Sequence, residues 1–326
     1  MFAGDGQPIS LGGGDLEAPR RGWQGGVMDV AVAEGALGAY PGFGDAAVEA
    51  VAASFNTVFR VEPVVGAAAA LRVGPVERIH PAGTELIEAR WMRALRADAG
   101  VPTPQVHDTA AGQPFVPGPR ICMLFEWVPG VALGEVMDPS RAGRMGALLA
   151  RIHDHAAGWP PDPAPLTADR VLYWQIEDRL DEVRSVDPIV GEAFARASAA
   201  VAELWADPPH RPHLLHGDFT PDNVMVHDDV LVPIDFQDLV VGFDIQDLAM
   251  ALVSLGRFDD ADDLRRRFRV GYETVRPWPG PDRPLLDTLI AARRLHQLNL
   301  ALTLRRPGLD HFIARARQLL GEWMAP

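Results

Sequence analysis

The residues best suited to chemistry stand together in the stretch LLHGDFTPDNVMVHDDVLVPIDFQD. His216, Gly217 and Asp218 come first, Asn223 follows, and Asp235 lies near the end of the stretch. Two carboxylates and an amide supply the hard oxygen atoms that Mg²⁺ prefers, and Mg²⁺ borrows further oxygens from substrate phosphates. Phosphoryl transfer needs such a metal, together with a separate carboxylate that orients the attacking hydroxyl and accepts its proton. The residue types therefore point to phosphoryl transfer.

The elements around these residues would bring them together. Two short apolar runs flank Asp228 and Asp229, which is the pattern of a β-hairpin with its turn at those two residues. An antiparallel hairpin with that turn places residue 223 opposite roughly residue 234. We therefore predict that Asn223 and Asp235 converge at the open end of the hairpin, beside Asp218.

These motifs resemble the catalytic signature of the aminoglycoside phosphotransferase and choline kinase-like family, H-G-D-x-x-x-x-N followed by I-D-F. The resemblance covers the chain from about Ala53 to its C-terminus, and it implies a two-lobed, protein kinase-like fold. It also implies that Asp218 is the catalytic base, that Asn223 and Asp235 hold Mg²⁺, and that ATP or GTP donates the phosphoryl group. His216 is expected to support the catalytic loop by hydrogen bonding.

The family's phosphate-binding cation stands on the strand after the first hairpin turn, and Leu71-Arg72-Val73 is similar to that place. The resemblance implies that Arg72 binds the α- and β-phosphates and that an acidic residue of the next helix holds it. We choose Glu88 as this partner, with Glu85 as the alternative one turn earlier. Arginine in place of the usual lysine is a departure, because a planar guanidinium binds phosphate bidentately. The chain contains no lysine at all.

Two further segments are expected to touch the nucleotide. Ser54, Asn56 and Thr57 could offer donors to phosphate, although the segment SFNTVFRV lacks the glycine-rich pattern of protein kinases. CMLFEWVPG is similar to the family's connection between lobes, where backbone groups of Glu126 and Val128 would bind the adenine edge. Downstream, Asp247 in DIQDLAMAL resembles the family's structural aspartate, which supports the catalytic loop from a helix start.

Other residues have less specific patterns. His210, His213 and His216 stand at steps of three and raise the possibility of a zinc site, but the prolines among them disfavour the regular geometry that such a site needs. Cys122, the single cysteine, lies in an apolar run and is read as a core residue rather than a nucleophile. A predicted helix around Tyr173, with Trp174, Glu177, Asp178 and Asp181, lies where the family recognises acceptors, and a surface helix is the competing interpretation.

Composition limits the classes of function. The 326 residues are 48% hydrophobic and 23% charged, which is typical of a folded globular chain, and the net charge is −14. A strongly acidic chain is a poor general binder of nucleic acids and anionic membranes. One cysteine excludes an intramolecular disulfide, and no apolar run is long enough to span a bilayer. We expect a cytoplasmic enzyme whose partners are a nucleoside triphosphate and a small hydroxyl-bearing substrate.

The pattern along the chain predicts an α+β fold in two lobes. We expect a flexible tail over 1–26, a nucleotide-binding lobe over 27–127 with an antiparallel sheet and one helix, and a mostly helical catalytic lobe over 128–326. Strands are predicted from 56, from 67, and in VPTPQVHDT and RICMLFEW, with a helix between over 79–96. Helices of the second lobe are predicted over 141–155, 166–186, 188–205, 259–275, 285–304 and 311–323.

Two other functions compete with a small-molecule kinase. A Ser/Thr protein kinase shares the implied fold, but no activation loop is recognisable between Asp235 and Asp247. A weakly active nucleotide-binding module is favoured by arginine at position 72 and disfavoured by the intact set of Asp218, Asn223 and Asp235. The sequence does not identify the acceptor.

Overall fold

The computed structural model describes residues 26–53, 55–161, 165–280, 283–304 and 308–325. Two compact units make up the chain. The N-terminal unit takes in residues up to Arg78 together with Ala82–Arg141 and Pro221–Gln237, and the C-terminal unit takes in Ile79–Pro81, Ala142–Thr220 and the chain from Asp238. The predicted tail lies outside the described residues, and the predicted lobe boundaries, 27–127 and 128–326, stay a prediction.

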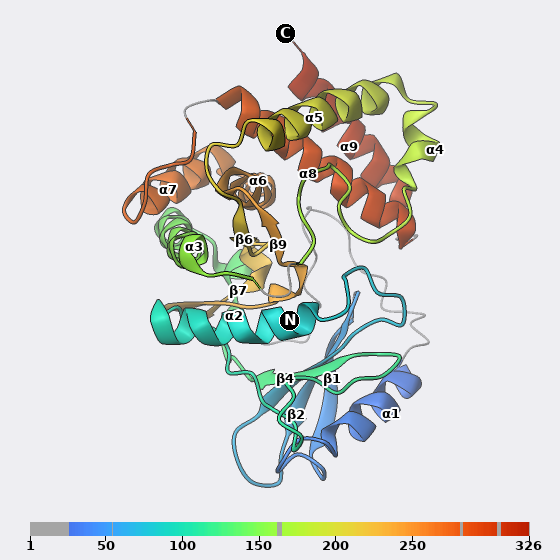
Figure 1. Cartoon of the computed structure of the whole chain (residues 1–326), viewed down its shortest axis with the longest axis vertical. Helices are drawn as coiled ribbons and strands as arrows, with labels where there is room; N and C mark the ends of the chain where they lie inside the picture. The colour runs from blue at the N-terminus through green and yellow to red at the C-terminus, as the bar shows by residue number, and fades with distance from the viewer. Residues whose placement is uncertain (1–25, 54, 162–164, 281–282, 305–307, 326) are drawn as a thin grey trace. The chain divides into compact units, whose positions relative to one another are not determined.

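A four-stranded antiparallel sheet forms the centre of the N-terminal unit (Figure 1). Its strands follow one another in chain order: β1 Ala47–Ala53, β2 Thr57–Glu62, β3 Ala69–Val73 and β4 Cys122–Glu126. Buried and partly exposed side chains alternate along β2 and β3, so one face of the sheet is apolar. Helix α1, Gly26–Leu37, contacts β1 and β3 and contributes Ala33 and Leu37 to this core.

The second helix of the N-terminal unit, α2, runs from Thr84 to Asp98, later than the predicted start at 79, and α1 adds a helix to the single one predicted for this lobe. Gly83, at φ 94°, precedes α2 in a left-handed conformation that ends the irregular segment before the helix. The strand predicted in VPTPQVHDT is wrong. Only Val106 forms a bridge, to Phe125 of β4, because Pro102 and Pro104 have no N–H to donate to a ladder.

The predicted hairpin is confirmed. Strands β7, Val224–His227, and β8, Val230–Pro233, pair in antiparallel register, and β5, Val131–Ala132, pairs with β7 on the other side. Asp228 and Asp229 have φ values of 45° and 61°, the left-handed pair that a two-residue hairpin turn of type I′ requires. Gly130, before β5, allows close approach, since a Cβ there would overlap the carbonyl oxygen of Val226.

The C-terminal unit is mostly helical. Helix α8 contacts α4, α5, α6 and α9, and α7 contacts α6 (Figure 1). Leu295 and Leu298 of α8 are fully buried in this core. A short antiparallel pair, β6 His213–Leu215 with β9 Val240–Gly242, was not predicted. The helices are α3 Pro139–Gly158, α4 Leu180–Arg184, α5 Pro188–Ala206, α6 Asp244–Leu255, α7 Ala261–Glu273, α8 Arg283–Thr303 and α9 Leu309–Met324.

The helix predicted over 166–186 is wrong except for the short α4. The backbone of this segment bonds to other elements instead of to itself. The N–H of Ala168 donates to Val241 of β9, and the N–H of Gln175 donates to Ile79. Trp205 and Gln246 both donate to the Ala168 carbonyl. Tertiary hydrogen bonds therefore override the local helical pattern.

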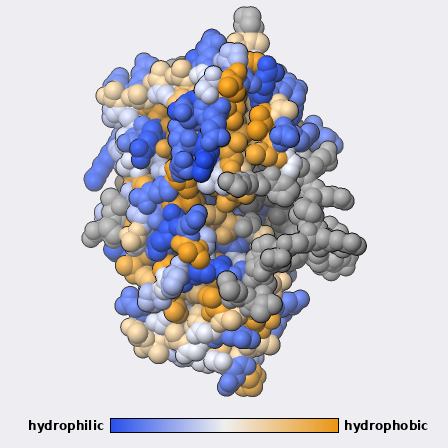
Figure 2. Space-filling model, turned by 90° about the vertical axis from the view of Figure 1, so that its right-hand side faces the viewer, coloured by the Kyte–Doolittle hydropathy of each residue, from blue (hydrophilic) through white to orange (hydrophobic). Residues whose placement is uncertain are grey.

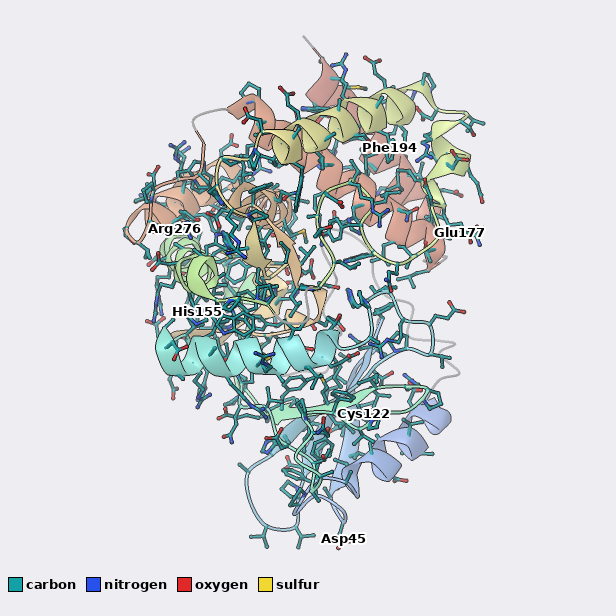
Figure 3. All side chains as sticks on the ribbon, in the orientation of Figure 1. Asp45, Cys122, His155, Glu177, Phe194 and Arg276 are labelled. Carbon is teal, nitrogen blue, oxygen red and sulfur yellow. The ribbon has the colours of Figure 1, made fainter. Side chains whose placement is uncertain are left out.

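The distribution of hydrophobic residues between surface and core is that expected from the composition. Hydrophilic side chains alternate with scattered hydrophobic ones on the face drawn in Figure 2. No helix within the described residues has the length and hydropathy that crossing a bilayer requires. Cys122 lies on β4 and is 1% exposed (Figure 3), and burial raises the pKa of its thiol to about 11. The prediction that it is a core residue is confirmed.

Candidate active site

The H-G-D loop of the C-terminal unit begins where β6 ends. Gly217 has φ 80°, and a Cβ at this position would overlap the carbonyl oxygen of Asp238. Only glycine meets both conditions without strain. The sequence therefore needs glycine between His216 and Asp218 to turn the chain so closely, and the loop geometry explains the middle residue of the motif.

Asp247, in the first turn of α6, holds this loop. Its Oδ1 accepts the N–H of Gly217 at 3.0 Å, and its Oδ2 accepts the N–H of His216 at 3.0 Å and bonds Nε2 of His153 at 3.1 Å. Burial alone would raise the pKa of this carboxyl, but the bond to His153 and the backbone donors outweigh it and lower the pKa. The carboxylate thus stays ionised and positions the loop backbone, as the prediction of a structural aspartate requires.

Asp218 lies next to these supports. Its N–H points to Nδ1 of His216 at 3.4 Å, and its Oδ1 accepts a hydrogen bond from Nη2 of Arg293 at 3.1 Å. The His216 ring is fully buried and packs edge-on against Phe219. Asp218 keeps 15% of its side chain exposed. One carboxylate of the loop is therefore accessible while its surroundings are fixed.

In the N-terminal unit, Arg72 of β3 meets Glu88 of α2. The guanidinium donates through Nη1 and Nη2 to the two oxygens of Glu88, at 2.8 Å and 2.5 Å. Burial by itself would lower the pKa of Arg72, but the adjacent Glu88 carboxylate raises it. Glu85 instead pairs with Arg78 at 2.5 Å. The choice of Glu88 as the partner of Arg72 is confirmed, and phosphate binding by Arg72 stays a prediction.

Asp235 and Asn223 lie at the open end of the hairpin in the same unit. The N–H of Ile234 donates to the carbonyl of Asn223 at 2.9 Å, which continues the β7–β8 ladder to the position predicted from the turn. Asp235 follows at φ 61°, a strained conformation for a residue with a side chain. Its Oδ1 lies 3.3 Å from Nη1 of Arg72.

The donor set at this end of the hairpin suits a divalent cation. Asn223 and Asp235 offer amide and carboxylate oxygens, which are hard ligands, and the backbone strain at Asp235 is of the kind that functional sites retain. Arg72 lies beside Asp235 and would face phosphates bound there. The residues present therefore fit Mg²⁺ together with a polyphosphate.

The remaining predicted nucleotide contacts differ in their surroundings. The side-chain amide of Asn56 donates to Gln237 at 2.8 Å, and the hydroxyl of Thr57 donates to Asp29 at 2.5 Å, so Thr57 is committed to the core. Ser54 lies outside the described residues. The N–H of Glu126 already donates to the Gln105 carbonyl at 2.8 Å. Val128 makes no hydrogen bond within the described part of the chain, which leaves its N–H available.

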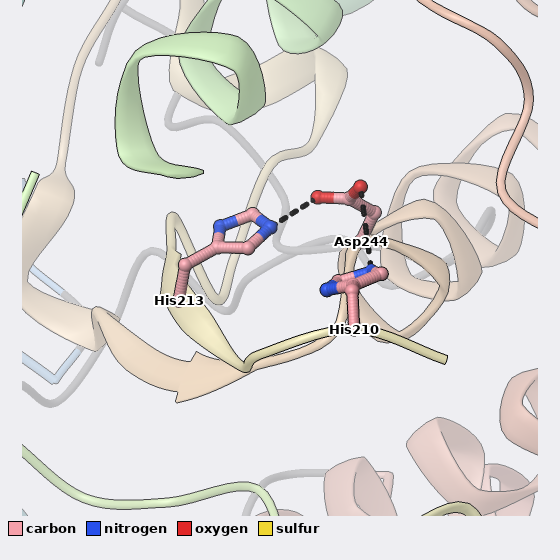
Figure 4. A group of neighbouring side chains, drawn as sticks. All are labelled: His210, His213 and Asp244. Carbon is pink, nitrogen blue, oxygen red and sulfur yellow. Dashed lines mark ion pairs between the residues drawn. The ribbon is translucent and has the colours of Figure 1, made fainter. Parts of the chain in front are cut away.

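The histidines considered for zinc separate into two groups. His210 and His213 approach Asp244, each with one ligand atom within 4.8 Å of the others (Figure 4), whereas His216 turns to Asp218. Asp244 also bonds Nη2 of Arg276 at 2.9 Å. Burial opposes ionisation of Asp244, yet neighbouring His153, His213 and Arg276 lower its pKa. A guanidinium on the shared carboxylate favours a buried ion-pair cluster over a metal site.

Comparison with known proteins identifies the family. The model of the phosphotransferase enzyme family, APH, matches residues 48–289, well over half of the chain. The chain belongs to this family. The resemblance inferred from the H-G-D and I-D-F motifs is thereby confirmed, and the protein is a phosphotransferase. No curated protein matches the sequence significantly.

Solved structures confirm the α+β, kinase-like fold of this phosphotransferase. The microcompartment-associated aminopropanol kinase is 22% identical, with a TM-score of 0.72 over 90% of this chain and 95% of that one. Amicoumacin kinase hAmiN, in complex with AMP-PNP, Ca²⁺ and Ami, is 16% identical, with a TM-score of 0.68 over 91% and 92%. A thermostable mutant of aminoglycoside phosphotransferase APH(4)-Ia with ADP and hygromycin B is 16% identical, with a TM-score of 0.60 over 91% and 97%.

Two residues of the site were not predicted from the phosphotransferase sequence. Arg293 of α8 contacts Asp218, and His153 of α3 contacts Asp247. A signal for Arg293 exists in the helical pattern, since it lies four residues after buried Leu289 and three before buried His296, on the stripe that faces the core. A buried arginine on an apolar stripe needs a partner, and here the partner is Asp218.

Proposed function

We propose that this phosphotransferase moves the γ-phosphoryl group of ATP, or of GTP, to a hydroxyl of a small molecule with the help of Mg²⁺. One observation carries the proposal. Arg72 is held bidentately by buried Glu88 and at the same time lies 3.3 Å from Asp235, so a cation able to bind phosphate lies beside a carboxylate suited to metal. This combination is what a polyphosphate with its cation requires.

The roles of the residues follow from their positions. Asp218 orients the acceptor hydroxyl and takes its proton, while the acceptor oxygen bonds the γ-phosphorus and the bond from that phosphorus to the bridging oxygen of the nucleotide breaks. Arg72 binds the phosphates, and Glu88 keeps its guanidinium in place. Asn223 and Asp235 hold the metal. A bound divalent cation would neutralise charge on the phosphates.

The supporting residues place these groups without touching the substrate. His216 and Asp247 hold the loop that carries Asp218. We expect the nucleotide base to bind the carbonyl of Glu126 and the free N–H of Val128. The side-chain amide of Asn56 donates to Gln237, and we expect it to face the phosphates only if that bond is exchanged.

A small acceptor is supported by the similar solved kinases. They are named for aminopropanol, amicoumacin and aminoglycosides, all of which are small molecules with hydroxyl groups. A protein substrate gains no support from the described residues. A weakly active nucleotide-binding module remains as an experimental outcome rather than as a second proposal.

The proposal is tested by incubating the full chain with ATP or GTP, Mg²⁺ and a panel of hydroxyl-bearing metabolites and antibiotics. We expect release of nucleoside diphosphate with at least one acceptor. Asp218→Asn should lower kcat by roughly 10²–10⁴ and leave nucleotide affinity nearly unchanged, as the loss of a general base does. Thermal stabilisation by ATP with Mg²⁺, but no phosphate transfer across the panel, would instead indicate a binding module.

A further inference from the structure

Arg293 of α8 touches the catalytic loop through Asp218. Its side chain is 7% exposed and its guanidinium lies over the ring of Trp174, with 5.3 Å between Cζ and the ring centroid. Nη1 donates to the hydroxyl of Tyr173 at 2.7 Å, Nη2 to Asp218 at 3.1 Å and Nε to the sulfur of Met250 at 2.8 Å.

These contacts leave part of the guanidinium unused. Arginine has five N–H bonds, and three of them have partners within the described residues. One N–H on each terminal nitrogen is left over. Tyr173 is a neutral partner, because burial raises the pKa of its hydroxyl to about 12. The positive charge of Arg293 is therefore balanced in direct contact by Asp218 alone.

A small hollow, partly open to solvent, lies beside Arg293 in the C-terminal unit. Its charged lining consists of Arg293, Arg170 and Asp247. Both oxygens of Asp247 are occupied by the loop N–H groups and by His153, so this carboxylate has little to offer a ligand. Arg170 makes no hydrogen bond or ion pair with any described residue.

His296 completes the polar lining. It is 1% exposed, and neither ring nitrogen makes a hydrogen bond of good geometry, although the carbonyl of Val171 faces the ring. Burial, with the charge of nearby Arg293, keeps the pKa of His296 well below its ordinary value, so the ring is neutral at pH 7. A neutral ring can donate or accept one hydrogen bond, but it adds no negative charge to attract an ammonium group.

We propose that the acceptor carries an anionic oxygen group, such as a carboxylate, beside the hydroxyl that Asp218 orients, and that Arg293 binds this group. The inference rests on the proposed function and names its substrate class as hydroxy acids. A guanidinium with one N–H left on each terminal nitrogen suits a carboxylate, and charge-assisted bonds of this kind are among the strongest. An ammonium at the same place would meet two arginines, while the nearby carboxylates of Asp247 and Asp218 already accept hydrogen bonds.

The experiment uses acceptors matched in size and different in charge. Glycolate, glycolamide and ethanolamine form one series, and lactate, lactamide and aminopropanol form a second. Both turnover with ATP and Mg²⁺ and direct binding by titration calorimetry are measured on the full chain. We expect the hydroxy acid to exceed its amide in kcat/KM or in affinity by roughly 10- to 100-fold, the worth of a charge-assisted pair.

Variants assign this preference to one residue. Arg293→Gln should bring the ratio of hydroxy acid to amide close to one, and Arg293→Lys should restore part of it. Taking the ratio cancels any general damage from leaving Asp218 without its partner. Arg294→Gln is the matched control, because this neighbour on α8 lies near Arg265 and Arg315 rather than near the loop. It should leave the ratio unchanged.

Two results would overturn the proposal. In one, the wild type binds or turns over the amines better than the acids, or binds no hydroxy acid at all. In the other, Arg293→Gln lowers kcat for acid, amide and amine equally, which would assign Arg293 to the transferred phosphoryl group or to Asp218 alone. Failure of the kinase function looks different, since hydroxy acids would still bind in calorimetry while no ATP is consumed.

Discussion

Two arginines whose side chains are 11% and 7% exposed, Arg72 and Arg293, have nearly the same surroundings in the two units. Arg72 lies over Phe125 and contacts the sulfur of Met123, while Arg293 lies over Trp174 and contacts the sulfur of Met250. Each also reaches a carboxylate of the predicted site, Asp235 for Arg72 and Asp218 for Arg293. The aromatic ring and the thioether let a guanidinium be buried without a full set of anions.

The difference between them is one carboxylate. Arg72 has a bidentate carboxylate partner within the protein, Glu88, which is 1% exposed. At the equivalent place Arg293 has a neutral partner, the hydroxyl of Tyr173. Arg72 is thus a fixed cation with its charge largely compensated. Arg293 keeps more of its charge for a ligand. The fixed partner therefore sets how much of the guanidinium's charge is left for a ligand, which we propose to be phosphate for Arg72 and the acceptor for Arg293.

The largest effect is expected at Glu88, the carboxylate that distinguishes Arg72 from Arg293. Glu88→Gln removes the bidentate partner and leaves Arg72 buried with Asp235 alone, and breaking a buried pair in this way costs about 3 kcal/mol. We expect a loss of that size in the free energy of unfolding, measured by urea denaturation. The control is Glu85→Gln, whose pair with Arg78 is partly exposed and should contribute less than about 1 kcal/mol. Equal losses in the two variants would contradict the assignment.

A second prediction separates the ligands of the two arginines. Arg72→Gln should raise the KM for ATP by roughly 10- to 100-fold and change acceptor affinity little, because it loses charge-assisted bonds to phosphate. Arg293→Gln should do the reverse and act on the acceptor. Steady-state kinetics with each substrate varied in turn measures both effects. If the two variants changed the same constant, the two arginines would share one ligand.

Much of the N-terminal unit was predictable because its signals are local. The turn at Asp228–Asp229 set the register of the hairpin, and from that register the positions of Asn223 and Asp235 followed. The pairing of Arg72 with Glu88 was expected from the resemblance to the family, which left Glu85 as the alternative, and the structure confirms Glu88. Gly217 was recognisable in the motif, although the close carbonyl of Asp238 that requires it was not.

In the C-terminal unit, local sequence patterns did not predict several elements and contacts correctly. The helical period over 166–186 is real, yet Ala168 and Gln175 bond to distant strands and loops, so most of the helix does not form. Glu177 and Asp178, expected near an acceptor, pair instead with Arg179 and Arg184 on the surface. The contact of Arg293 with Asp218 spans 75 positions, and no local pattern can indicate which partner a buried arginine will find.

The neutral histidine beside Arg293 gives a third prediction. His296 resists protonation in the folded state, whereas it binds a proton with an ordinary pKa near 6.5 when unfolded. The unfolded state therefore gains a proton as pH falls below 6.5, and stability drops by about 1.4 kcal/mol per pH unit from this group. Urea unfolding of the wild type and of His296→Gln, between pH 7.5 and 5, should show slopes that differ by about one proton. If the free energy of unfolding changed with pH equally in both proteins, His296 would be protonated in the folded state and would add a positive charge to the hollow.

The smallest effect is expected at the methionine sulfur that both arginine sites share. Met123→Leu and Met250→Leu each replace the thioether by an alkyl group of similar volume, and such exchanges usually cost less than about 1.5 kcal/mol. Met123 is 1% exposed and Met250 is 3% exposed, so the packing terms are matched. The sulfur contact should matter more for Arg293, because its Nε has no other partner within the described residues. We therefore expect the slightly larger loss of stability, measured by urea denaturation, in Met250→Leu. A larger loss in Met123→Leu would mean that Glu88 does not compensate Arg72 as fully as their geometry indicates.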